Sequence, residues 1–197
     1  MIDTATIRAI CQQPFDGGRE WRAHGIGMLR TYLDDDRMVR LNLWHHLLIN
    51  PGISTMHTHP WSLRSDIMAG KLVNTRWERT SKGRPEARLF VEDRIPCGMV
   101  SNPEFALKGE ERDVWLFPLT PEILLPGQSY FQSPEEIHTT QFDDGTATIM
   151  RRDGGADGVT EASVFWPKGE VWGDASRDVT ADEIVTVCHA VLARLDL

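Results

Sequence analysis

The segment MHTHPW, residues 56–61, places two histidines one residue apart, a spacing that can hold a metal ion. In an extended chain, residues i and i+2 project from the same face, so the imidazoles of His57 and His59 would lie together. A third ligand must come from elsewhere, and the strongest candidate is His138 in YFQSPEEIHTT, where another strand is expected to begin. Neutral imidazoles suit Fe, Zn, Cu or Ni, and three on one face leave open positions for water or a substrate. The alternative is that these histidines are polar residues satisfied by backbone groups.

The elements that must position these histidines are short β-strands between two terminal helices. Residues 3–12 have the cap and the apolar spacing of a short helix. Further along, β-rich runs alternate with Pro-, Gly- and Asp-rich turns, without intervening helices, which is typical of an all-β sandwich or barrel. Thr180 and Glu183 then form a capping box before an apolar stripe at helical spacing. We expect a single domain over residues 1–197, with a barrel core at about 27–167 and a C-terminal helix at about 180–196.

Composition and charge exclude several classes of partner. The 197 residues carry a net charge of −8, with 21 Lys and Arg residues scattered among 29 acidic ones. Such a field repels phosphate backbones, so no nucleic-acid partner is expected. No apolar run approaches the roughly 20 residues that cross a bilayer, so no membrane partner is expected either. The three cysteines are widely spaced, which suits buried thiols in a reducing compartment, and we expect a cytoplasmic protein.

The spacing around His57 and His59 resembles the first motif of the cupin superfamily, G(x)5HxH(x)3–4E(x)6G. The segment GISTMHTHPWSLRSDIMAG supplies both histidines and both glycines, Gly52 and Gly70, with Gly52 one residue nearer than usual. Leu63 occupies the position of the glutamate of the motif.

The second cupin motif, G(x)5PxG(x)2H(x)3N, is matched more loosely by Gly127, Pro134 and His138. The resemblance covers about residues 40–152. It implies a cupin-type double-stranded β-helix, or jelly-roll barrel, in which His57, His59 and His138 are the metal ligands.

The missing glutamate makes the sequence similar to the cysteine dioxygenase-like thiol dioxygenases, the cupins with three histidine ligands. That resemblance implies a mononuclear non-haem Fe(II) dioxygenase, with Zn, Ni, Cu and Mn as the metals that the residues leave open. A ferrous ion with three neutral ligands keeps its +2 charge, so its partners would be O2 and a small anionic, chelating organic substrate. Two departures argue against cysteine itself as the substrate. The strand after His138 reads TATIMRRD and lacks the family's catalytic tyrosine, and residues 79–113 form an insertion between the two motifs.

Two polar residues near the ligands are candidates for a supporting role. Strand alternation turns Ser65 to the same side as Leu63, where its hydroxyl could bond a substrate, although a locally satisfied serine is the alternative. Glu136 precedes His138 by two residues and could orient a ligand imidazole or act as an acid or base. A solvated turn glutamate is the alternative for Glu136.

An anionic substrate would favour a guanidinium, which binds a carboxylate through two parallel hydrogen bonds. Arg40, Arg76 and Arg151 lie on expected strands and are the candidates, and the sequence does not choose among them. Trp61, two residues after His59, is a candidate for a cavity wall that excludes water.

Two other classes of function remain open at this point. The metal could act as a Lewis acid in a redox-neutral isomerase, lyase or hydrolase, or the barrel could be a non-catalytic ligand-binding cupin. The C-terminal helix would pack on the barrel or form the contact of a homodimer.

Overall fold

The computed structural model describes residues 2–96, 111–155, 161–169 and 176–196, and it confirms an all-β barrel with a helix near each end of the chain. Helix α1 (Thr4–Gln12) begins at Asp3, whose carboxylate accepts the backbone N–H of Thr6. Helix α2 (Ala181–Leu195) begins with the expected capping box between Thr180 and Glu183. A short 3-10 turn, η1 (Asp16–Gly18), follows α1. Neither described α-helix has the length and apolar character that a membrane span requires.

The strands form two antiparallel seven-stranded sheets. The first sheet has the order β10 (Ser129–Gln132), β5 (Trp61–Ala69), β12 (Thr146–Gly155), β3 (Val39–Ile49), β2 (Ile26–Tyr32), β1 (Arg22–His24) and β14 (Ser176–Arg177). The second has the order β11 (Ile137–Phe142), β4 (Met56–His57), β13 (Glu161–Pro167), β7 (Arg88–Pro96), β8 (Arg112–Pro118), β6 (Leu72–Thr80) and β9 (Glu122–Leu124). Because β11 also pairs with β6, six strands of the second sheet close into a ring.

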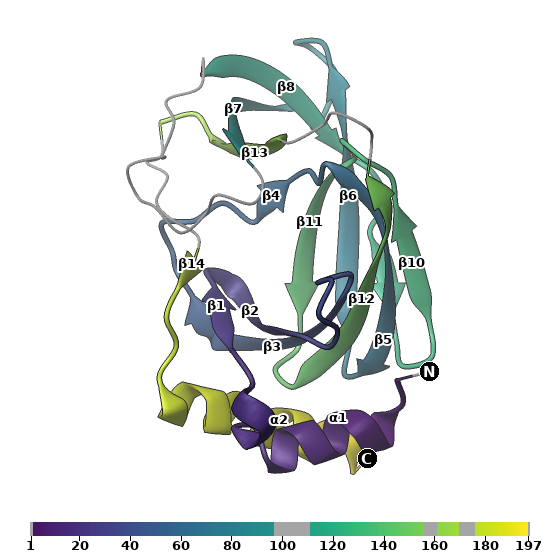
Figure 1. Ribbon diagram of the computed structural model, residues 1–197. Helices are drawn as coiled ribbons and strands as arrows, with labels where there is room; N and C mark the ends of the chain where they lie inside the picture. Colours follow the sequence, from purple (N-terminus) through teal and green to yellow (C-terminus); the bar gives the residue numbers. More distant parts are fainter. Residues whose placement is uncertain (1, 97–110, 156–160, 170–175, 197) are drawn as a thin grey trace.

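Both faces of the first sheet are covered. The two helices pack against each other and lie along its outer face, below β3 in Figure 1. Leu29, Leu41 and Ile149 point to this side and join the largest apolar core. Cys11 of α1 and Cys188 of α2 are buried in the same core as expected, whereas Cys97 lies outside the described residues. The alternate residues of β2, β3 and β12 point to the opposite face, toward the second sheet.

The closed ring has a core of its own, which sets the direction of two histidines. Met56, Ile137 and Phe165 are among the apolar side chains that fill it. His57 and His138 directly follow Met56 and Ile137, so strand alternation turns both imidazoles out of the ring and toward the first sheet. Residues 79–113, expected as an insertion, contribute β7 and the start of β8 to this ring.

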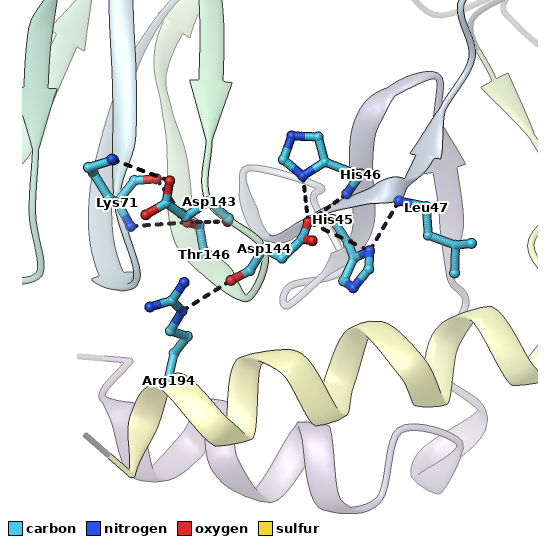
Figure 2. Close-up of polar contacts among 8 residues, drawn as sticks. All are labelled: His45, His46, Leu47, Lys71, Asp143, Asp144, Thr146 and Arg194. Carbon is cyan, nitrogen blue, oxygen red and sulfur yellow. Dashed lines mark hydrogen bonds and ion pairs between the residues drawn. The ribbon is translucent and has the colours of Figure 1, made fainter.

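The glycine that ends the first motif is required by a close approach between two turns. Gly70 has a φ of +74°, and a Cβ there would lie 2.7 Å from the Cα of Thr146. Around this point the Thr146 hydroxyl contacts the carbonyl oxygens of Lys71 and Asp143, at 2.9 and 2.7 Å (Figure 2). Gly52, at the other end of the motif, has no positive φ, and a Cβ there would meet only Asn50 Oδ1, at 3.6 Å.

Candidate metal centre

A cavity of about 1030 Å³ lies between the two sheets, and the three histidines of the sequence motifs line it. His57 of β4 is the direct cross-strand partner of His138 of β11, and His59 follows two residues later. The potential ligand nitrogens of the three side chains all lie within 4.8 Å of one another. The structure therefore brings together the three residues chosen from the sequence, in an arrangement that could hold one metal ion.

Hydrogen bonds fix the orientation of two of the imidazoles. His138 Nδ1 lies 3.0 Å from Asn74 Oδ1, and His57 Nδ1 lies 3.1 Å from the carbonyl oxygen of Thr55. Both partners are acceptors, so each Nδ1 carries the proton and each Nε2 keeps its lone pair. The Nε2 atom of His138 is buried and has no hydrogen-bond partner in the described part of the chain. This free nitrogen fits a metal ligand.

The protonation state of the cluster also suits a metal. Burial lowers the pKa of His57 and holds the pKa values of His59 and His138 well below the ordinary value of 6.5. The positive charge of Arg40 adds to the effect at His57 and His59. The imidazoles are consequently neutral at neutral pH, which is the form that coordinates metals.

Leu63 occupies the place where the cupin motif has its glutamate, and it faces the cavity. Its side chain is buried and belongs to the apolar cluster that includes Trp44 and Met150. The candidate ligand set among the described residues is thus three imidazoles without a carboxylate.

The two polar candidates beside the ligands have different surroundings. Ser65 is buried in the cavity wall, opposite Tyr130 of β10 in the sheet register. Glu136 does not line the cavity: its carboxylate is 2.6 Å from Arg76 Nε and accepts the backbone N–H of Ser133. These bonds engage Glu136 at a turn and away from the His138 ring.

Of the three arginine candidates, only Arg40 lines the cavity. It is 8% exposed, and its Nε has no hydrogen-bond partner among the described residues. Arg76 faces the same side of the sheet as His138 but forms ion pairs with Glu136 and Glu122. Arg151 points away from the cavity and pairs with Asp66. Trp61 lines the cavity as expected, with its ring centroid 5.8 Å from that of His59.

Several cavity residues were not singled out from the sequence. Among them are His24, Arg30, Tyr32, Tyr130 and Arg152. Strand pairing is the signal that would have identified Tyr32 and Arg152. Tyr32 lies opposite Arg40 on the neighbouring strand, and Arg152 lies opposite Leu63. His24 is enclosed, and burial holds its pKa well below 6.5. Together with the three ligand candidates it makes up a set that we call the cavity histidines: His24, His57, His59 and His138.

The adjacent histidines His45 and His46 lie apart from this cluster, where β3 approaches the turn before β12 (Figure 2). His46 Nδ1 is 2.8 Å from Asp144 Oδ1, and the same carboxylate oxygen accepts the backbone N–H of His46. Arg194 of α2 donates to the carbonyl oxygen of Asp144, which ties the helix to this turn. These contacts stabilise a turn and leave the cavity to other residues.

No protein-family model matches the chain, and no curated protein is significantly similar to it in sequence. The chemistry of the cavity is therefore the basis for a functional assignment.

Proposed function

We propose that this protein is a cupin enzyme with a mononuclear non-haem Fe(II) centre, and that it is a dioxygenase for a small anionic, chelating substrate. His57, His59 and His138 would hold the metal. The observation that carries the proposal is the convergence of three neutral imidazoles, without a carboxylate, in a cavity that also contains the buried cation of Arg40.

The donor set favours an anionic substrate for an electrostatic reason. Three neutral ligands leave a divalent ion with its full charge, and three imidazoles leave room for a chelating molecule. When bound there, Fe(II) would supply the activation of O2. Zn, Ni, Cu and Mn fit the same nitrogen donors and are the competing metals in the test below.

The protein's own residues would bind and orient the substrate. Arg40 would bind a carboxylate, because its guanidinium is buried in the cavity wall and its Nε is unpartnered. Trp61 and Leu63 provide apolar walls that exclude water. Burial raises the pKa of Tyr130, so its phenol stays protonated at neutral pH and can donate a hydrogen bond from Oη.

Oxygen uptake tests this proposal directly. Metal-free protein is loaded anaerobically with Fe(II) and then exposed to O2 with a panel of thiols, diketones and amino acids. We expect substrate-dependent O2 consumption that His57→Ala and His138→Ala abolish, while His46→Ala, outside the cavity, retains it. Equal turnover without O2 would instead establish a redox-neutral reaction.

A further inference from the structure

The cavity contains more positive charge than one substrate carboxylate would require. Arg30 of β2, Arg40 of β3 and Arg152 of β12 all line it, and all three have a buried Nε without a hydrogen-bond partner among the described residues. None of them forms an ion pair with a carboxylate of the described chain. Arg40 is buried, and Arg30 and Arg152 are half-buried. Withdrawing a guanidinium from water without an anionic partner is costly, so this arrangement is suited to a ligand that supplies the charge.

The acidic residues that border the same cavity do not neutralise these arginines. Glu20 and Asp178 are exposed and both pair with Arg22. Asp34 accepts the backbone N–H groups of Met38 and Val39 within its own turn. Asp35 is exposed to solvent. The inner wall is therefore positive, while the mouth carries both signs of charge.

The three guanidiniums are close enough to influence one another. Burial, with the charges of Arg30 and Arg152, lowers the pKa of Arg40 to about 10, so Arg40 is still protonated at neutral pH. Burial opposes ionisation of the Tyr32 phenol, but the combined charges of these arginines outweigh it and lower the pKa of Tyr32. These effects place the arginines and Tyr32 in one electrostatic cluster.

One indole ring connects this cluster with the histidines. The guanidinium carbon of Arg152 lies 3.8 Å from the centroid of the Trp61 ring, a stacking contact that orients its planar fork. On the metal side, Trp61 is 5.8 Å from His59, centroid to centroid. A ligand that reaches the metal can therefore extend past Trp61 toward the arginines within the same cavity.

We propose that Arg30, Arg40 and Arg152 form a subsite for a dianionic end group, so that the substrate carries two negative charges at the end remote from its metal-binding atoms. A phosphate monoester and a pair of carboxylates share this chemistry, since a phosphate carries about 1.5 to 2 negative charges at pH 7. A cavity of about 1030 Å³ has room for such a group beyond the chelating atoms. The orientation of the substrate, with its chelating atoms at the metal, rests on the proposed function. The anion subsite does not, because its arginines line the cavity whether or not a metal is bound.

Anion binding to metal-free protein tests the subsite. Inorganic phosphate, succinate and acetate are titrated by calorimetry into chelator-treated protein. We expect saturable binding of at least one dianion and at least tenfold weaker binding of acetate. Tighter phosphate binding would identify a phosphate monoester as the end group, and tighter succinate binding a dicarboxylate. Equal affinity for acetate and both dianions would overturn the proposal.

Variants assign the binding to named residues. Arg30→Gln and Arg152→Gln should each weaken dianion binding about tenfold or more, because each removes a charge-assisted hydrogen-bond donor. Arg88→Gln removes an equal charge from an exposed position outside the cavity and should leave the affinity unchanged. Arg152→Lys keeps the positive charge but removes the planar guanidinium, so it measures the contribution of the guanidinium to binding. It replaces Arg152→Gln if that variant does not fold. Unchanged affinity in the Arg30 and Arg152 variants would show an adventitious ion only.

The same titration separates this inference from the proposed function. His138→Ala should lose metal binding but retain dianion binding within about twofold, because its side chain is a metal ligand and not part of the arginine cluster. Protein that binds phosphate through the arginines but takes up no iron would refute the proposed function alone. Protein that binds dianions only after iron is added would refute the arginine subsite alone.

Discussion

Replacement of Asn74 by leucine should weaken metal binding by about tenfold to a hundredfold. Asn74 is 1% exposed, and its Oδ1 accepts the Nδ1 proton of His138 at 3.0 Å. Without this acceptor, coordination through Nε2 would leave a buried N–H without a partner, at a cost of about 1–3 kcal/mol. Metal coordination fixes Nε2 on the metal and the proton on Nδ1, whereas the metal-free ring can rotate or exchange its proton between the two nitrogens, so most of the penalty falls on the bound state. Because 1.4 kcal/mol corresponds to a factor of ten in affinity, this cost agrees with the predicted tenfold to hundredfold loss of metal binding.

Competition with a chromophoric chelator measures this effect, with Zn(II) in air and Fe(II) under anaerobic conditions. Thr139→Val is the matched control, since it removes the hydrogen bond that the Trp77 indole N–H donates to Thr139 Oγ1, at 3.2 Å, beside His138 but outside the cavity. Thr139→Val should bind metal as tightly as the original protein. If folded Asn74→Leu protein also binds metal within twofold of the original, the assigned orientation of His138 is wrong.

Three further predictions concern the fold that surrounds the site. In metal-free protein, the cavity histidines have pKa values below their unfolded value of 6.5, so the unfolded state binds more protons in acid. Stability should be complete above about pH 6.5 and fall as the pH passes down through the lowered values; equal urea midpoints at pH 7.5 and 5.0 would contradict this. Gly70→Ala should cost at least about 2 kcal/mol of unfolding free energy, because its Cβ would meet Thr146 at a positive φ, whereas Gly52→Ala should stay within about 0.5 kcal/mol in the same denaturation assay. Glu92, 1% exposed and bonded to two arginines, has a pKa of about 2, so its contribution is present above pH 4.5 and lost toward pH 2. Glu92→Gln should therefore cost about 2–3 kcal/mol at pH 7 and much less near pH 2, and a loss that does not depend on pH would argue against an ionic role.

The three histidines of the candidate metal centre could be predicted from the sequence because most of their signal is local. The i, i+2 spacing of His57 and His59 sets their common direction, and a third histidine at the start of a strand was a natural partner. The hydrogen bond from His138 to Asn74 could not be predicted in the same way, since it depends on the pairing of β11 with β6. That pairing joins residues 64 positions apart.

The arginines show why alternation alone did not reveal the cavity wall. On β12, Ile149 and Arg151 share one face, while Met150 and Arg152 share the other. Both faces contain apolar residues, because α1 and α2 bury the outer side of this sheet and the cavity buries the inner side. The apolar pattern is therefore ambiguous, and Arg151 rather than Arg152 was chosen as a candidate. Arg40 was a candidate and lies on the cavity side. Identifying Arg30 and Arg152 as its neighbours depends on the register of β2, β3 and β12, which the sequence does not show.

The most direct test of the metal centre is an anaerobic titration of chelator-treated protein with Fe(II), followed by elemental analysis of the isolated complex. We predict one equivalent of iron for each chain, lost in His57→Ala and His138→Ala and retained in His46→Ala. Folded protein that binds no iron, or that binds it equally well without the imidazole of His57 or His138, would contradict the assignment of the three histidines as its ligands.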